Sequence, residues 1–195
     1  MLTVACVNWG TKYSPLYVSI LESMVKRNLT VPYKFVCLTD KPENYTCNTI
    51  KLPEGLEGWW NKVYLFKKGL FDDKVLFLDL DVVITGSLDD LVKLDGFVSI
   101  KDWNYDSYNS SVMMLGNHPE IWDDFTPEVA KEWHGDQDWI TDKLPFRNYF
   151  PEEWCLSYRR SCIGGVPETC KVVVFHGNPK PNNCRSGWVK KLWRI

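Results

Sequence analysis

Residues 2–27 read LTVACVNWGTKYSPLYVSILESMVKR, and this stretch decides the fold. Its first seven residues, LTVACVN, are rich in β-branched and small apolar residues, which is typical of a buried strand that ends at Asn8. Ser14 and Pro15 then suit the N-cap and first turn of a helix, in which apolar residues recur at helical spacing up to two basic residues. A strand, a loop and a helix in this order open an α/β fold.

The same alternation continues along the chain. YKFVCLTD (33–40) predicts a second strand, WWNKVYLFKKGL (59–70) a second helix, and KVLFLDLDVVIT (74–85) a third strand. Further strands are predicted in GFVSIKD, SVMMLG and CKVVVFHG, and further helices in PEIWDDFTPEVAKEW and DQDWITDKL. We therefore expect one α/β domain over residues 1–195, with a mixed, mainly parallel sheet and helices on both faces.

Composition limits the classes of protein that remain. The formal net charge of −2, from 23 basic and 25 acidic residues, gives no general positive field, so general nucleic-acid binding is not expected. No apolar stretch approaches the ~20 residues of a membrane span, and the N-terminus has no basic leader, so we expect a cytoplasmic protein. The seven cysteines form no Cys-x-x-Cys pair and are interpreted as reduced and structural.

The C-terminal segment CRSGWVKKLWRI (184–195) mixes tryptophans with basic residues. It would suit a peripheral contact with anionic lipid, or a terminal element that packs its tryptophans on the domain. The shortness of the segment favours packing.

Polar residues follow several of the predicted strands. In an open α/β sheet the ligand lies outside the carboxyl ends of the strands, so we expect these residues to converge. They are Asn8 to Tyr13, Asp40, Asp79 with Asp81, and His176. No Gly-x-Gly-x-x-Gly or Walker-type loop follows the first strand, which argues against dinucleotide binding and P-loop phosphoryl transfer.

Asp79 and Asp81 end an apolar run with one leucine between them. In a strand they would lie on the same side, where two like charges destabilise each other unless a positive charge is close. A hard divalent cation, Mg²⁺ or Mn²⁺, would take their oxygens together with those of a substrate phosphate. The pair therefore favours a metal–phosphate site over an exposed acidic turn.

Two enzyme classes use such a pair. In a haloacid-dehalogenase-like phosphatase Asp79 would be the nucleophile and Asp81 the general acid, although that motif normally lies on the first strand. In a nucleotide-sugar glycosyltransferase the pair holds a metal on the donor diphosphate. The late stretch VVVFHGNPKPN (172–182) favours the second class, because His176 offers a metal ligand and Lys180 a cation for a diphosphate.

Four motifs, KVLFLDLDVVITGSLDDL, YNSSVMML, GDQDWI and FHGNPKP, occur in this order. Together they resemble the retaining GT-A glycosyltransferases of the family 8 type, which include glycogenin and bacterial lipopolysaccharide galactosyl- and glucosyltransferases. The resemblance runs from the first strand to about residue 181. It implies a Rossmann-like GT-A domain that transfers a hexose from a UDP-sugar, UDP-glucose or UDP-galactose, to an acceptor hydroxyl with retention. A non-catalytic nucleotide-sugar-binding module is the other alternative.

The resemblance also implies roles for single residues at the reaction centre. Asp79 and Asp81 match the family's metal-binding Asp-x-Asp, and His176 matches its third ligand to Mn²⁺ (or Mg²⁺). Gly177 and Lys180 match the loop on the donor diphosphate, with Lys180 as a fixed positive charge during the reaction. No strong protein base is required by this chemistry, because the leaving phosphate would accept the proton.

Other matches concern the donor sugar and the nucleoside. Lys62 falls where the family has a basic residue touching the donor, and Asn109 matches an asparagine that meets the sugar. Asp136 would hold sugar hydroxyls, and Gln137 would orient or stabilise the developing cation. The uridine-binding segments match in position Asn8, Tyr13 and Asp40.

The sequence departs from the family in two of these motifs. Ser111 stands where glycine is common, and the last motif is a shortened His-Gly-x-x-Lys-Pro without the family's tryptophan. The acceptor, whether saccharide, glycolipid or protein, is not indicated. Three of the ten tryptophans are candidates for acceptor stacking: Trp59, Trp60 and Trp103.

Overall fold

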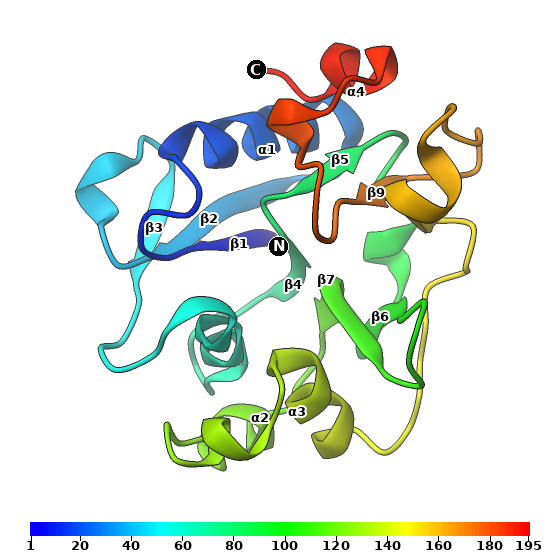
Figure 1. Ribbon diagram of the computed structural model, residues 1–195. Coiled ribbons are helices and arrows are strands. Elements are labelled where there is room, and N and C mark those ends of the chain that lie inside the picture. Colours follow the sequence, from blue (N-terminus) through cyan, green and yellow to red (C-terminus); the bar gives the residue numbers. More distant parts are fainter.

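The computed structural model describes residues 1–195 and contains a six-stranded sheet, a small three-stranded sheet, and helices on both faces of the larger one (Figure 1). The large sheet has the order β3-β2-β1-β4-β7-β6 and the small sheet the order β5-β9-β8. The strands are β1 (Leu2–Asn8), β2 (Tyr33–Thr39), β3 (Asn48–Lys51), β4 (Lys74–Leu78), β5 (Val82–Ile84), β6 (Phe97–Lys101), β7 (Tyr108–Leu115), β8 (Cys155–Ser157) and β9 (Val172–Val174).

Strands β1 to β4 run parallel to one another, whereas β7 is antiparallel to both β4 and β6. The expected mixed, mainly parallel sheet is therefore confirmed. The chain leaves β1 toward β2 and β3 on one side and returns as β4 on the other side of β1. This reversal of strand order creates a crevice at the carboxyl ends of β1 and β4, the usual ligand position in open α/β sheets.

The helices are α1 (Pro15–Asn28), α2 (Glu120–Asp123), α3 (Asp136–Lys143) and α4 (Gly187–Leu192), joined by short 3₁₀ and π turns. The helix predicted from the first motif begins at Pro15 with Ser14 as N-cap residue, as expected. The predicted helix over 59–70 is instead a 3₁₀ helix, η2 (Gly58–Phe66), and the one predicted from residue 119 is divided into α2 and a 3₁₀ turn, η4 (Val129–Glu132). Pro127 lies between these two pieces and cannot continue a helix.

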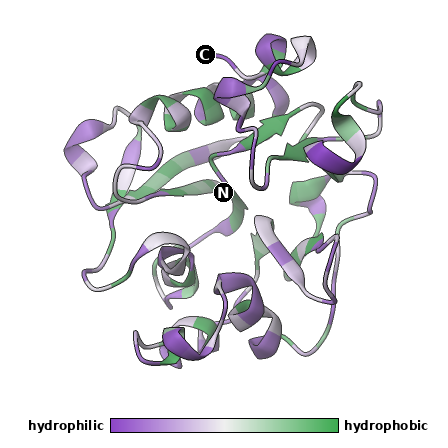
Figure 2. Cartoon of the chain, in the orientation of Figure 1, coloured by the Kyte–Doolittle hydropathy of each residue, from purple (hydrophilic) through white to green (hydrophobic).

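Alternate residues of the central strands serve two separate cores. In β4, Leu76 and Leu78 join the core that includes α1 and the small sheet, whereas Val75 and Phe77 join the core under η2, α2 and α3. The period of two follows from the pleat, and burial on both faces explains why these strands are almost continuously apolar. Figure 2 shows hydrophobic colour along the central strands and a largely hydrophilic α3.

The predicted single strand over 74–85 is wrong. Strand β4 ends at Leu78, and β5 begins at Val82 in the other sheet. The Asp79 N–H donates to the Ser111 carbonyl in β7 (2.8 Å), whereas the Asp81 carbonyl accepts from the Phe175 N–H (3.2 Å). The two aspartates therefore form the turn that passes the chain from one sheet to the other.

The late predicted strand over 170–177 is also shorter than expected, since β9 covers only Val172–Val174. It pairs antiparallel with β5 and parallel with β8 in the small sheet. His176 consequently lies in the loop beyond the last strand pair.

The C-terminal segment packs on the domain. The Trp188 indole N–H donates to the Cys162 carbonyl (3.1 Å), and Trp193 meets Tyr17 edge-on with 5.0 Å between ring centroids. Arg27 donates to the carbonyls of Leu192 and Arg194. These contacts favour the packing interpretation of residues 184–195.

No helix of the protein combines the length and apolar character that crossing a membrane requires. All seven cysteines are free thiols, and six of them are buried, as expected for structural residues.

Candidate active site

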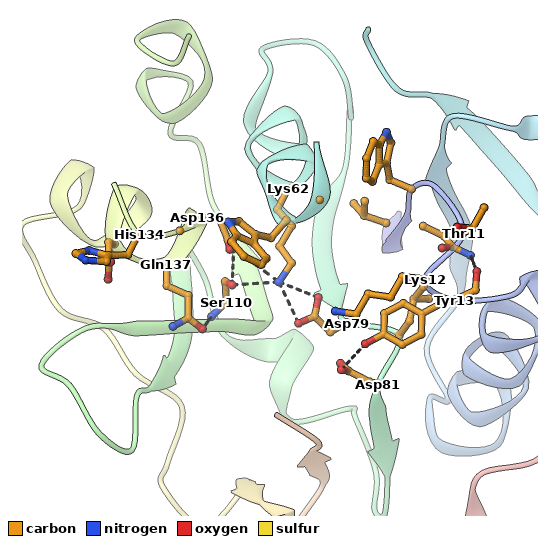
Figure 3. Close-up of a pocket in the computed structure, with 18 of the residues that line it drawn as sticks. Thr11, Lys12, Tyr13, Lys62, Asp79, Asp81, Ser110, His134, Asp136 and Gln137 are labelled. Carbon is orange, nitrogen blue, oxygen red and sulfur yellow. Dashed lines mark hydrogen bonds and ion pairs between the residues drawn. The ribbon is translucent and has the colours of Figure 1, made fainter. Parts of the chain in front are cut away.

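A cavity of about 770 Å³ opens at the carboxyl ends of β1 and β4 (Figure 3). Its walls come from the loop after β1, from η2, from the Asp79–Asp81 turn, from β7 and from the start of α3. Segments far apart in the sequence thus meet at the crevice that the strand order creates. This size lies within the range of small-molecule sites in proteins.

Lys62 lines the cavity and is the centre of a polar network. Its ammonium lies 2.9 and 3.0 Å from the two carboxylate oxygens of Asp79, 3.7 Å from Asp136, and donates to the Ser110 hydroxyl at 3.1 Å. The Ser110 hydroxyl in turn donates to Asp136 (2.5 Å). Figure 3 shows this network, which joins η2, the Asp79–Asp81 turn, β7 and α3 through one side chain that is only 12% exposed.

Asp81 is held by two other groups. The Tyr13 hydroxyl donates to its Oδ2 at 2.7 Å, and the Lys180 ammonium donates to the same oxygen at 2.5 Å. Lys180 also donates to the Phe175 carbonyl at 2.9 Å, which fixes the ammonium beside the turn. Each carboxylate of the pair therefore has its own lysine.

Burial and charge shift the pKa values of this site. Burial raises the pKa of Asp79 to about 6, against the opposing effect of Lys62 and with support from the charges of Asp81 and Asp136. Burial would lower the pKa of Lys62, but the carboxylates of Asp136 and Asp79 outweigh it and raise that pKa. Burial and Asp81 both raise the pKa of Tyr13, which keeps its phenol protonated as a hydrogen-bond donor.

The structure does not bring His176 together with the two aspartates. Its Nε2 shares a hydrogen bond of 2.6 Å with the Ser157 hydroxyl, and its ring stacks on Trp103 at 5.4 Å. Burial and the nearby Arg159 lower the pKa of this imidazole. No three His, Cys, Asp or Glu side chains gather closely enough to hold a metal ion, so the predicted three-ligand set is not assembled in this geometry.

The donor set still fits a hard divalent cation at the Asp79–Asp81 turn. Asp79 and Asp81 form an acidic pair, and Lys62 links Asp79 to a third carboxylate, Asp136. Burial and the two neighbouring carboxylates disfavour the charged form of Asp79, which a bound cation would stabilise. Mg²⁺ and Mn²⁺ commonly take one or two carboxylates and complete their shell with phosphate oxygens and water. Two protein ligands are enough for that chemistry.

The remaining predicted residues are placed as follows. Asn8 and Gln137 line the cavity, and Gln137 accepts a long hydrogen bond (3.4 Å) from the Ser110 N–H. Asp40 does not line the cavity; its carboxylate accepts a hydrogen bond from the Gly10 N–H (3.1 Å), so it supports the loop after β1. Asn109 is buried away from the cavity wall and bonds Asp102 (3.2 Å) and the Ser111 N–H (3.1 Å).

Gly177 adopts a left-handed conformation (φ 73°) beside the Arg159 guanidinium, where an added Cβ would come within 3.1 Å of a guanidinium nitrogen. A side chain at this position would displace Arg159 and strain the backbone. The glycine of the last motif thus shapes the loop that carries Lys180.

Sequence reasoning missed several lining residues. Ser110 is one residue past the predicted Asn109, and His134 and Asp138 flank the predicted Asp136 and Gln137. Ser110 and Asp138 lie within the motifs YNSSVMML and GDQDWI, and His134 directly precedes the second one, but the direction of their side chains depends on strand and helix register. Tyr105 lies in a loop with no motif, so no sequence signal pointed to it.

No family model matches this chain, and no curated protein matches it. Solved structures do. The glycosyltransferase GlyE of Streptococcus pneumoniae TIGR4 superimposes with a TM-score of 0.72 at 14% identity, over 99% of this chain and 60% of GlyE. The galactosyltransferase LgtC, solved with donor and acceptor sugar analogues, gives 0.67 at 14% identity, over 97% of this chain and 93% of LgtC.

The bifunctional glycosyltransferase WbbM gives a TM-score of 0.65 at 12% identity, over 97% of this chain and 50% of WbbM. This chain therefore spans about 60% of the length of GlyE and half that of WbbM. At these identities the likeness establishes the fold. The protein has the GT-A glycosyltransferase fold, with its cavity at the switch point of the sheet.

Proposed function

We propose that residues 1–195 form a single catalytic domain that transfers a hexose from a UDP-sugar, UDP-glucose or UDP-galactose, to an acceptor hydroxyl. The observation that carries this proposal is the Asp79–Asp81 turn at the switch point, with Lys62 on one carboxylate and Lys180 on the other. Paired carboxylates and paired ammoniums suit a diphosphate together with its cation. The resemblance to family 8 enzymes and the shared fold with LgtC support the same conclusion.

In this proposal Asp79 and Asp81 hold a divalent cation, Mn²⁺ or Mg²⁺, whose positive charge would stabilise the diphosphate as a leaving group. Lys180, freed from Asp81, binds a phosphate oxygen. Tyr13 keeps Asp81 oriented by its hydrogen bond. Asn8, at the end of β1, has a buried side-chain oxygen without a partner and would accept a hydrogen bond from the nucleoside.

The sugar would lie over the start of α3. Asp136 would accept bonds from sugar hydroxyls, and Gln137, whose amide reaches the cavity, would face the anomeric carbon. During transfer the anomeric carbon leaves a phosphate oxygen and bonds the acceptor oxygen, and the acceptor proton passes to the leaving phosphate. Retention of configuration is part of the proposal and rests on the resemblance.

The proposal is tested by UDP release from UDP-glucose and UDP-galactose, with Mn²⁺ present. Asp79→Ala and Asp81→Ala are each expected to lower the rate by about 10²–10³, because each removes charge stabilisation from the transition state. Asp95→Asn is the matched control, since Asp95 is 93% exposed and pairs only with Lys74. Equal activity with excess chelator would remove the metal from the mechanism.

Two outcomes would replace the proposal with another function. UDP binding in a calorimeter without UDP release from any UDP-sugar would indicate a binding module. Release of phosphate from an aryl phosphate, abolished by Asp79→Asn, would indicate a phosphatase.

His176 as a third metal ligand is a separate part of the proposal. If it binds the metal, His176→Ala raises the Mn²⁺ concentration needed for half-maximal activity. If it acts only through Ser157 and Trp103, the variant lowers the melting temperature equally with and without Mn²⁺, and the metal requirement does not change.

A further inference from the structure

Trp59 is the only exposed tryptophan of the ten. It is 54% exposed at the start of η2, on the wall of the cavity, whereas the other nine are buried or half-buried. A ligand that covers this indole would remove apolar surface from water, which is favourable.

The indole of Trp59 has no aromatic neighbour and no hydrogen-bond acceptor within the protein. Its neighbour Trp60 packs on Phe125 at 5.1 Å, and the indole N–H groups of Trp139 and Trp188 donate to backbone carbonyls. Trp59 has neither kind of contact. It rests against Gly135, where an added Cβ would lie 3.4 Å from its Nε1, so the ring is seated on the backbone at the start of α3.

Polar groups with unused hydrogen-bonding capacity line the same wall. His134 is fully exposed, and its Nδ1 lies 3.7 Å from the Asp138 carboxylate, too far for a hydrogen bond. Asp138 is 40% exposed, and both residues line the cavity. Tyr105, 73% exposed, adds a second open aromatic ring to it.

An aromatic face beside hydroxyl-binding groups matches the chemistry of a pyranose. The C–H bonds on one face of the sugar ring meet the negative face of the indole, and the hydroxyls at its edge reach carboxylate and imidazole. The groups proposed for the donor lie deeper, since Asp136 and Asn8 are 5% and 3% exposed. A ligand at Trp59 therefore enters from solvent, as an acceptor does.

We infer that Trp59 is the stacking platform for a sugar ring of the acceptor, and that the acceptor is a saccharide. Asp138 and His134 receive the hydroxyls of the same ring. This inference rests on the proposed function, because it places the acceptor relative to the proposed donor site, but saccharide binding at Trp59 can be measured without turnover.

The test is saturation-transfer NMR with lactose and with maltose as probes, on wild type, Trp59→Ala, Trp59→Phe and Phe146→Ala. Phe146 is the matched control, because it is 89% exposed and lies outside the cavity. Trp59→Ala is expected to weaken binding of the better probe about tenfold, as alanine replacement of a stacking aromatic does in other sites. Trp59→Phe should retain most of the binding, and Phe146→Ala all of it.

Saccharide binding that is equal in Trp59→Ala and wild type would overturn the inference, and so would the absence of binding of either probe to wild type. A calorimetric titration with UDP separates a third case. If Trp59→Ala weakens UDP binding and leaves the saccharide signal intact, Trp59 stacks on the nucleobase and the inference is wrong. If wild type binds the saccharide through Trp59 but neither binds UDP nor releases it, the proposed function fails and the saccharide site stands.

Discussion

Lys62 holds two carboxylates at once, and its removal should affect stability more than any exposed lysine does. In Lys62→Met, Asp79 and Asp136 lose their shared cation inside the protein. Breaking a buried ion pair from one side costs about 3–5 kcal/mol, and we expect the lower end because Asp79 is 20% exposed. Urea unfolding at pH 7 measures the effect, with the exposed Lys68→Met as control.

The pH dependence of this variant has a definite sign. Burial has already raised the pKa of Asp79 to about 6, and loss of Lys62 raises it further. When the pKa of a carboxyl is higher in the folded protein than in the unfolded chain, the free energy of unfolding falls as pH rises from the unfolded-state pKa to the folded-state pKa. The free energy of unfolding of Lys62→Met should therefore fall more steeply between pH 5 and pH 8 than that of wild type. Parallel curves would contradict the coupling of Lys62 to Asp79.

His176 shows what residue-level sequence reasoning can and cannot supply. The residue type and its neighbours in FHGNPKP predict a metal ligand, and this stays a prediction, because the direction of the imidazole depends on more than the residue type. Val174 pairs with Val82, and the Phe175 N–H bonds the Asp81 carbonyl, so His176 is carried past the last pair toward Ser157. The direction in which a side chain points beyond the end of a strand depends on the strand register, which the sequence alone does not specify.

At the scale of elements, Gly116 at the end of β7 is a position that only glycine suits. Its φ is +62°, and an added Cβ would lie 2.6 Å from the Phe97 N. Gly116→Ala should therefore destabilise the β6–β7 pair by both backbone strain and a backbone clash, about 3 kcal/mol in total.

Gly69→Ala is the matched control for this effect, because Gly69 has a similar φ (+74°) with no atom near the position of a Cβ. It should cost only about 1 kcal/mol. Equal losses of unfolding free energy in urea for the two variants would show that the contact with Phe97 relaxes without cost.

The terminal helix α4 should matter for stability rather than for lipid binding. Trp188→Ala removes a half-buried ring and its bond to the Cys162 carbonyl, and we expect a loss of about 2 kcal/mol. Replacing the exposed Lys190 and Lys191 by serine should leave stability unchanged. If that double variant sediments less with anionic liposomes than wild type, the tail does contact membranes.

Among the elements, those with a strong periodic signal were predicted well and those that depend on tertiary contacts were not. The strand, loop and helix of residues 2–28 appear as expected. The stretch 74–85 has the residues of one long strand, yet its halves join different sheets because the partners of β5 come from near residue 173. Local propensity cannot reveal a partner ninety residues away.

For the whole molecule, donor binding should appear as a gain in thermal stability. A ligand at 100 times its Kd stabilises the folded state by about 2.7 kcal/mol, which for a chain of this size raises Tm by about 5–10 °C. We expect this shift with UDP and Mn²⁺ together in wild type and in Asp95→Asn. Asp79→Ala should abolish it. An equal shift with UDP and excess chelator would show that the nucleotide binds without the metal.

The turn at Asp79–Asp81 also connects the two sheets. Lys62 reaches it from the side of the large sheet, and Lys180 from the loop after β9 of the small one. A diphosphate bound there would contact groups from both sheets and hold them together, so amide hydrogens of β5, β8 and β9 should exchange more slowly in its presence. Slower amide exchange in the small sheet would then indicate that a diphosphate is bound at the turn, although none of the strand residues of this sheet lines the cavity.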